Sequence, residues 1–397
     1  MPFVSGLADI DVQIPFFTQS VTFERLWPLI SRHVDEIGRR GKYSHGPKVA
    51  EFEQALARYT GARFVIGVNS GTDALVLLLR AAGLEPGDEV VVPAYGFVAS
   101  ASSVVLAGGR PVFADIDRRS YALDPAAADA AVTPRCRFIL PAHMFAQVAD
   151  MGGILRVAAR HGLTVLEDSA EAIGMRWAGV HAGLLGAGGV LSFFPTKTLG
   201  AIGDAGAVLT DDERIAETVG ALRHHGRFGR TLDHFPGIAN PTELSGVNSK
   251  MDDIQAAVLL AKLTCLDADI ETRARLAAGY TERLSGLAGI VRLPAAVDRP
   301  VVTTGVCYVY LVEVARRAEL AEYLARRGIG TESYYPMPLP RQPCFAHLGY
   351  SGGEFPNAEA ACRRALALPL YPDLGMAGVD RVCAAIRAFC AASGGGG

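Results

Sequence analysis

Between residues 64 and 210 the chain alternates short apolar, β-branched runs with longer stretches rich in alanine and leucine. The short runs are continuously apolar, as in strands buried on both faces, and the longer stretches have helical length. This alternation predicts an α/β fold with a mostly parallel sheet flanked by helices. The predicted strands are 64–68, 89–93, 111–115, 138–141, 164–168 and 190–193, and the predicted helices are 71–82, 98–107 and 151–161.

The pattern changes after about residue 246. A long helical stretch is expected at 251–283, and a mixture of strands and helices follows it. We therefore predict a large domain at 1–245 and a smaller α+β domain at 246–397. The elements expected after the long helix are strands at 306–314 and 331–335 and helices at 318–327, 357–365 and 378–391.

Composition narrows the classes of function. The chain has 397 residues, half of them hydrophobic, and a formal net charge of -3, which does not favour a nucleic-acid surface. Seven cysteines without CxxC spacing predict a reduced, cytoplasmic protein and no zinc site. No basic signal-peptide start and no apolar run of roughly 20 residues are found, so no membrane partner is expected.

One lysine is placed for chemistry. The segment Ser-Phe-Phe-Pro-Thr-Lys at 192–197 follows an apolar strand and precedes a glycine-rich run at 200–206. A partly desolvated amine at such a place can form a Schiff base with an aldehyde cofactor, most often pyridoxal 5'-phosphate (PLP). The alternative for Lys197 alone is an ordinary surface lysine on a loop.

Three further segments follow predicted strands, and ligands bind where the strands of open α/β sheets end. Gly71 and Thr72 open a helix whose amides could bind a phosphate, although the segment could equally be an ordinary helix cap. Asp168 could pair with a pyridine nitrogen or cap a helix. Phe97 could stack on a flat ring or lie in the core.

Together these segments resemble the DegT/DnrJ/StrS family of PLP-dependent aminotransferases, which aminate keto-sugars and aminocyclitol precursors. The resemblance runs from about residue 41 to 370. It implies a fold-type-I, aspartate aminotransferase-like transferase. The segments that carry the resemblance are 70–75, 93–99, 167–170, 192–197, 203–206 and 246–252.

The resemblance also implies individual roles. Lys197 would be the catalytic residue that bonds to the cofactor and then shuttles a proton. The cofactor-binding residues at matching positions are Gly71, Thr72, Phe97, Asp168, Glu171, Ser192, Lys197 and Asn248. Asn248 is similar to an asparagine that reaches the phosphate from the neighbouring subunit, so a homodimer with shared active sites is implied.

Several positions depart from the family pattern. Glu171 stands where Gln or His is usual near the phenolic oxygen of the cofactor, so we expect it to be protonated or turned away. Lys250 replaces an arginine, Tyr334 and Pro340 replace histidines, and the segment after Tyr95 lacks a usual threonine. The residues predicted to contact substrate are Lys42, Tyr95, His143, Lys250 and Tyr334.

The leading hypothesis is an aminotransferase that moves an amino group from L-glutamate or L-glutamine to a keto-sugar, nucleotide-linked or not, or to a keto-cyclitol. Such a reaction belongs to amino-sugar, antibiotic or polysaccharide biosynthesis. One alternative is a PLP-dependent sugar dehydratase, but relatives of that kind resemble this family with histidine in place of Lys197. Another is a non-catalytic PLP-binding regulatory protein, which the intact Lys197, Asp168 and Asn248 disfavour.

Overall fold

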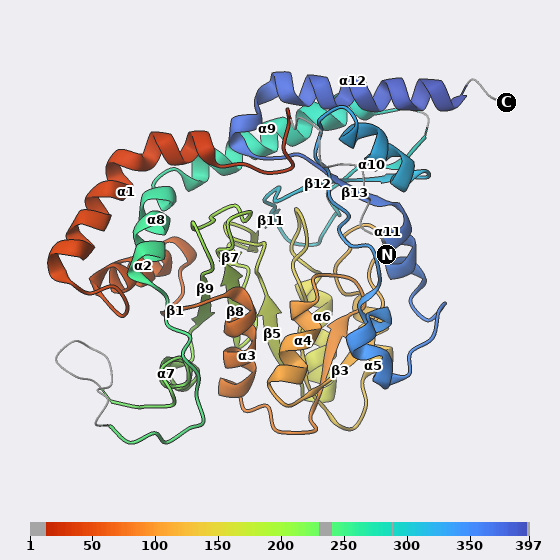
Figure 1. The fold of residues 1–397 in the computed structure, drawn as a ribbon. Helices are drawn as coiled ribbons and strands as arrows, with labels where there is room; N and C mark the ends of the chain where they lie inside the picture. The colour runs from red at the N-terminus through yellow and green to blue at the C-terminus, as the bar shows by residue number, and fades with distance from the viewer. Residues whose placement is uncertain (1–12, 230–239, 288, 395–397) are drawn as a thin grey trace.

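The computed structural model describes residues 13–229, 240–287 and 289–394 (Figure 1). Its largest sheet has seven strands in the order β1-β9-β8-β5-β4-β2-β3. β9 runs antiparallel to β1 and β8, whereas the other neighbours are parallel, so the predicted mostly parallel sheet is confirmed. The strands are β1 (Phe64–Val68), β2 (Glu89–Pro93), β3 (Arg110–Ala114), β4 (Cys136–Ile139), β5 (Thr164–Asp168), β8 (Gly188–Ser192) and β9 (Gly206–Thr210).

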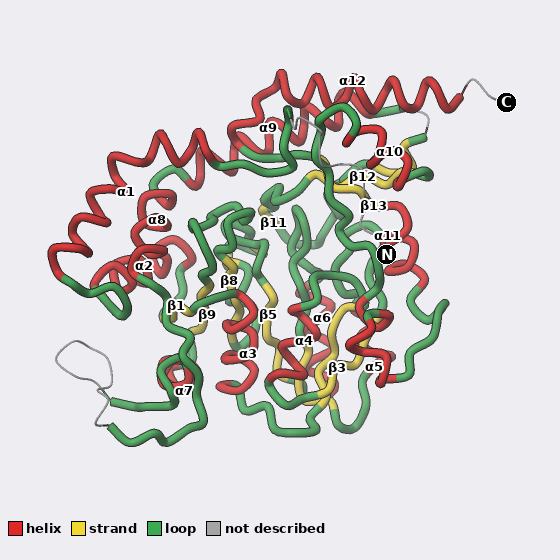
Figure 2. The backbone as a smooth tube through the Cα atoms, in the orientation of Figure 1, coloured by secondary structure: helices red, strands yellow, loops and turns green. Residues whose placement is uncertain are grey.

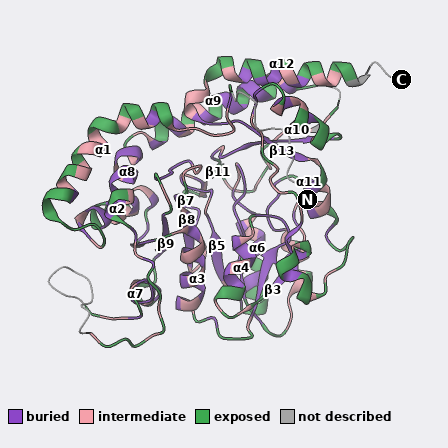
Figure 3. Cartoon of the chain, in the orientation of Figure 1, coloured by how far each residue is buried: buried purple, intermediate pink, exposed green. Residues whose placement is uncertain are grey.

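Both faces of this sheet are buried, as its apolar strands require (Figure 3). Successive side chains of a strand point to opposite faces. Val90 and Val92 of β2 accordingly belong to one hydrophobic cluster, and Val91 belongs to another. The helices of this part are α1 (Ser20–Arg40), α2 (Pro47–Thr60), α3 (Gly71–Ala81), α4 (Ala99–Leu106), α5 (Pro125–Ala131), α6 (Met151–His161) and α7 (Glu213–Leu222).

The C-terminal part is built on a smaller antiparallel sheet in the order β10-β12-β13. Its longest helices, α9 and α12, lie side by side across one end of the molecule (Figure 2). The elements are α8 (Asp253–Leu263), α9 (Leu266–Leu284), β10 (Ile290–Arg292), β12 (Tyr310–Val314), α10 (Arg317–Ala325), α11 (Pro356–Arg364), β13 (Ala365–Leu368) and α12 (Gly375–Gly394). A third sheet joins β11 (Thr303–Thr304), β6 (Arg176–Trp177) and β7 (Val180–His181).

Two elements predicted for the C-terminal part differ from the structure in type or extent. The helix expected at 251–283 is two helices, because Cys265 leaves the helical conformation with φ -118° and ψ 8°. This break lets α8 pack on α1 and α2 while α9 packs on α12. The strand expected at 331–335 is reduced to one isolated bridge between Glu332 and Ala367, and the chain then turns toward the large sheet.

The division at residue 246 stays a prediction about domains. The chain passes from one hydrophobic cluster to another further along than residue 246, within α9. Leu266 belongs to the cluster that contains β1 and β9 residues, whereas Leu276 belongs to the cluster of the small sheet. No helix within the described ranges has the length and apolarity needed to cross a bilayer.

Candidate active site

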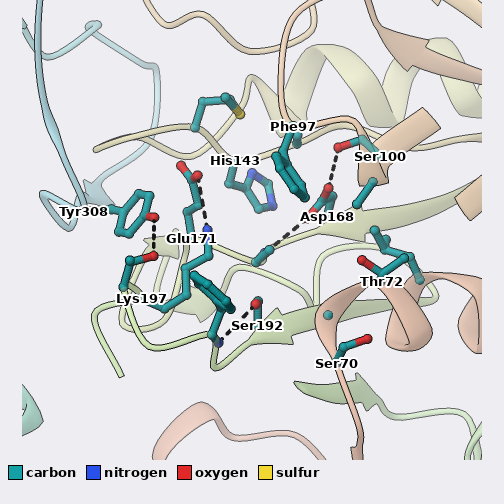
Figure 4. A pocket seen from close by; sticks show the side chains of 18 of the residues that line it. Ser70, Thr72, Phe97, Ser100, His143, Asp168, Glu171, Ser192, Lys197 and Tyr308 are labelled. Atoms are coloured by element: carbon teal, nitrogen blue, oxygen red, sulfur yellow. Dashed lines mark hydrogen bonds and ion pairs between the residues drawn. The ribbon is translucent and has the colours of Figure 1, made fainter. Parts of the chain in front are cut away.

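A cavity of about 500 Å³ opens where β1, β2, β4, β5 and β8 end, at the edge of the sheet that faces the C-terminal part. Figure 4 shows its side chains converging from these strand ends and from the segment before β12. The structure thus brings together residues that the sequence scatters over more than half of the chain. The predicted site residues that line the cavity are Gly71, Thr72, Phe97, His143, Asp168, Glu171, Ser192, Lys197 and Tyr334.

Lys197 points its amine into this cavity. The Nζ atom lies 3.4 Å from Oε1 of Glu171 and 4.3 Å from the ring centroid of Tyr308. A cation over an aromatic face is attracted to the ring. The backbone around the lysine is fixed as well, because the Lys197 amide donates to the carbonyl of Phe194 at 2.8 Å. Lys197 is therefore a partly buried, held amine, and the surface-loop alternative does not describe it.

Asp168 ends β5 with its carboxylate in the cavity. Oδ2 accepts a hydrogen bond from Ser100 Oγ at 2.6 Å, and Oδ1 accepts one from the Ala170 amide at 3.2 Å. No described helix begins at this position, so Asp168 is not a helix cap. The two hydrogen bonds orient a carboxylate that can pair with a protonated ring nitrogen.

The start of α3 carries a helix cap and has the geometry to receive an anion. Ser70 is the cap, since its hydroxyl accepts from the Asp73 amide at 3.1 Å. The amides of Gly71 and Thr72 lie in the first turn, where amides have no partner within the helix, and both residues line the cavity. A Cβ atom on Gly71 would stand 2.8 Å from Cβ of Ser192. Glycine therefore allows the helix start and the end of β8 to approach closely enough to form one cup.

This set of groups fits PLP. First-turn amides and the hydroxyls of Thr72 and Ser192 suit a phosphate, and the helix dipole adds to the attraction. The ring of Phe97 is 57% exposed beside the cavity and offers a face for stacking. Asp168 suits the pyridine nitrogen and Lys197 suits the aldehyde. The four kinds of contact come from four different strand ends.

Glu171 is buried at the back of the cavity. Its Oε2 accepts a hydrogen bond from the Phe145 amide at 3.0 Å. Burial raises the pKa of Glu171, and this effect outweighs the lowering caused by Lys197 and the Phe145 amide. These observations support the expectation that Glu171 is protonated or engaged by other groups.

His143 lines the cavity with both ring nitrogens engaged. Nδ1 accepts from the Ala149 amide at 3.1 Å, so Nε2 carries the proton and donates to Glu167 Oε2 at 2.9 Å. Glu167 also accepts backbone hydrogen bonds from Gly183, Leu185 and Gly186. His143 therefore shapes the wall, and its predicted polar contact with substrate is not what this geometry favours.

The two predicted tyrosines differ in placement. Tyr334 lines the cavity, as expected of a substrate contact. Tyr95 is fully buried and is not among the lining residues. Its hydroxyl donates to the backbone carbonyl of Tyr334, so it supports that residue from behind. A direct substrate contact by Tyr95 is therefore not supported.

The remaining candidates lie outside the cavity. Asn248 and Lys42 are exposed, and the Lys250 amine donates to Asn248 Oδ1. The backbone of Lys250 pairs with Val68 at the end of β1, which places this segment near the rim of the site. Burial lowers the pKa of Lys250, and Arg223 and Arg227 lower it further.

Several residues that complete the site are not among the predicted ones. Ser100 and Thr196 were close to recognised positions, one in the helix after Phe97 and the other directly before Lys197. Tyr308 lies far along the chain, inside a predicted strand, and nothing in its neighbourhood indicated contact with Lys197. Only the folded arrangement reveals it.

Comparisons with known proteins find relatives along nearly the whole chain. A model of the DegT/DnrJ/EryC1/StrS aminotransferase family matches residues 28–387. A pleiotropic regulatory protein of Geobacillus stearothermophilus is 41% identical over 91% of this chain and 95% of its own length. The dTDP-3-amino-3,4,6-trideoxy-alpha-D-glucose transaminase of Streptomyces venezuelae is 37% identical over 94% and 96%. The solved structure of S. venezuelae DesV with a ketimine intermediate has a TM-score of 0.88 at 37% identity, covering 95% of this chain and 98% of that one.

Proposed function

The chain belongs to the DegT/DnrJ/EryC1/StrS aminotransferase family, and from this premise we propose that it moves an amino group from glutamate or glutamine to the ketone of a nucleotide-linked sugar. The fold-type-I architecture is confirmed by the likeness to the sugar aminotransferase structure over 95% of the chain. The observation that carries the proposal is the amine of Lys197, held in a cavity that also contains Asp168 and an anion cup.

Bound PLP would supply the electron sink that makes carbon–hydrogen bonds beside nitrogen acidic. The roles of the protein's residues follow from their positions. The amine of Lys197 would hold and move the proton in the cavity, Asp168 would anchor the ring, and Phe97 would cover one of its faces. Gly71, Thr72 and Ser192 would fix the phosphate, so that the reacting atoms stay in reach of Lys197.

The nature of the acceptor is supported by the relatives and by the cavity. The Streptomyces venezuelae relative is named for a dTDP-linked amino sugar, and a 34% identical Pseudomonas aeruginosa relative is named for a UDP-linked 3-oxo sugar. The cavity walls carry hydroxyls from Thr196, Ser333 and Tyr334, which suit an oxygen-rich substrate. A keto-cyclitol would meet the same walls and remains the second acceptor class in the proposal.

We further propose a homodimer whose second copy completes the site. Two large apolar side chains that line the cavity, Phe97 and Phe194, are also exposed at the surface. Exposed apolar groups that cluster at one rim are typical of an interface. Asn248 lies at the same rim, outside its own cavity, where it could reach the phosphate of a neighbouring subunit.

All seven cysteines are free, which supports a reducing, cytoplasmic location.

A regulatory protein is the second candidate, and one observation favours it. The 41% identical relative from Geobacillus stearothermophilus carries a regulatory name. Against it stands the cavity around Lys197, which also carries the hydroxyls of Thr196, Ser333 and Tyr334. A protein that only binds PLP has no need for polar groups placed to receive a substrate. We therefore rank amino transfer first.

The two candidates differ in what happens to the bound cofactor. The wild type, loaded with PLP, should convert it to the pyridoxamine form when glutamate or glutamine is added. A keto-sugar added next should restore the original absorbance. A protein that binds PLP but converts it with neither amino donor would favour the regulatory candidate.

A further inference from the structure

Three hydroxyl groups form a row along one wall of the cavity. Thr196 Oγ1 lies 3.3 Å from the Tyr308 hydroxyl, and the Tyr308 hydroxyl lies 3.5 Å from that of Tyr334. All three residues line the cavity. Thr196 follows β8 of the large sheet, whereas the two tyrosines come from the C-terminal part, so the row spans both parts of the protein.

The middle of the row lies beside the amine of Lys197. The amine of Lys197 lies over the ring of the same Tyr308 whose hydroxyl stands at the centre of the row (Figure 4). A molecule that reacts near Lys197 therefore presents its neighbouring substituents to these hydroxyls.

Tyr308 is held rigidly in this position. Its amide donates to the carbonyl of Phe145 at 2.8 Å, and its carbonyl accepts from Nη1 of Arg273 at 3.0 Å. Arg273 is itself buried and also donates to the carbonyl of Leu370 at 2.8 Å. These bonds fix the backbone of Tyr308, and its buried side chain packs in the hydrophobic core, which restricts the ring without substrate.

Tyr334 is fixed by stacking. Its ring lies against that of Tyr335 with centroids 5.0 Å apart and planes within 8°, and its carbonyl is bound by Tyr95. The two distances in the row, 3.3 and 3.5 Å, are longer than the roughly 2.7–2.8 Å usual between hydroxyls. Weak mutual hydrogen bonds leave the donors of the row available to a bound molecule. Burial raises the pKa of Tyr308 to about 12, so its hydroxyl keeps its proton at neutral pH.

We propose that the hydroxyls of Tyr308 and Tyr334 bind a hydroxyl group of the acceptor on the carbon next to the ketone that receives the amino group. This inference rests on the proposed amino transfer. A neutral row suits a neutral sugar hydroxyl, which can donate to it and accept from it at once. The hydroxyls of the row carry no positive charge of their own for the carboxylate of the amino donor, and the amine beside them is the reacting group Lys197. Asp168, Glu171 and Asp204 on the cavity walls would repel that carboxylate if ionised.

The experiment uses the two half-reactions separately. Tyr308→Phe and Tyr334→Phe keep the rings and remove only the hydroxyls. Tyr310→Phe is the matched control, because Tyr310 lies in β12 and its hydroxyl pairs with Thr281 at 2.8 Å, away from the cavity. Stopped-flow absorbance then follows the reaction of the PLP form with glutamate or glutamine. It also follows the reaction of the pyridoxamine form with a keto-sugar and with its analogue lacking the adjacent hydroxyl.

The wild type should react with the keto-sugar about tenfold faster, in kcat/KM, than with the deoxy analogue, as expected for loss of one or two neutral hydrogen bonds. Each cavity variant should lose this preference by slowing only on the keto-sugar, and Tyr310→Phe should retain it. Variants that slow equally on both acceptors, or that slow the amino-donor reaction as much, would overturn the assignment. A wild type that fails with the amino donor itself would instead contradict the proposed function.

Discussion

The Nζ atom of Lys197 lies 3.4 Å from Oε1 of Glu171, and the other oxygen of Glu171 is occupied by the Phe145 amide. The carboxyl is buried, so removing it from water costs more than its attraction to the lysine returns, and its pKa is raised. The protein thus places an ionisable group beside its reactive amine and keeps the charged form of that group unfavourable.

This relationship predicts how stability varies with pH. The unfolded carboxyl ionises near its ordinary value of 4.5, whereas the folded one stays protonated to higher pH. The folded state then binds more protons, so wild-type stability should fall as pH rises from 4.5 through the folded pKa. Glu171→Gln lacks this loss. In cofactor-free protein, the melting temperature of Glu171→Gln relative to that of the wild type should therefore rise over that pH interval. Above the folded pKa the difference between the two melting temperatures should stay constant.

Glu319→Gln is the control for this series. The pKa of the Glu319 carboxyl on the surface is lowered by the neighbouring Arg316. The melting temperature of Glu319→Gln should therefore not rise relative to that of the wild type as the pH increases. A melting-temperature difference between Glu171→Gln and the wild type that stays flat from pH 4 to 8 would contradict the raised pKa.

Gly71 predicts a steric test of the anion cup. Alanine at this position would bring its Cβ to 2.8 Å from Cβ of Ser192, so the helix start must move away from the end of β8. We expect Gly71→Ala to weaken PLP binding by at least tenfold, measured by titration of absorbance. Gly220→Ala in α7 is the matched control, because nothing lies within 4 Å of its Cβ position. That variant should bind PLP normally and gain roughly 0.5–1 kcal/mol of stability. Equal PLP affinity in both variants would place the phosphate elsewhere.

The proposed shared site predicts that two inactive chains can complement each other. Lys197→Ala removes the amine, and Asn248→Asp places a negative charge where the partner's cofactor phosphate would lie. A dimer of one chain of each kind has one intact site, so random mixing should restore about one quarter of wild-type activity. Activity is measured after the two variants are unfolded and refolded together. If each site used only its own Asn248, mixing would restore nothing.

The sequence predicted six of the seven strands of the large sheet, all except β9, because these strands are buried on both faces and their ends carry short, distinctive segments. The positions of Lys197, Asp168 and Gly71 could be read from such segments. Tyr308 could not, because its contact with Lys197 depends on how the C-terminal part packs against the large sheet.

The errors have a similar origin. The helical pattern at 251–283 is continuous in apolar spacing, and the break at Cys265 accompanies the packing of α8 on α1 and α2 and of α9 on α12. The segment at 331–335 has the β-branched and aromatic composition of a strand, but Tyr334 and Tyr335 stack on each other and line the cavity. His143 was predicted to contact substrate, because its hydrogen-bond partner Glu167 can be identified only from the fold.

The most direct test of the account is the absorbance of the purified protein with PLP, compared between the wild type and Lys197→Ala. The wild type should show the visible band of lysine-bound cofactor, which should disappear when glutamate or glutamine is added and return with a keto-sugar. Lys197→Ala should show neither the band nor turnover. A wild type that is indifferent to PLP, or a Lys197→Ala variant that transfers amino groups as fast as the wild type, would contradict the account.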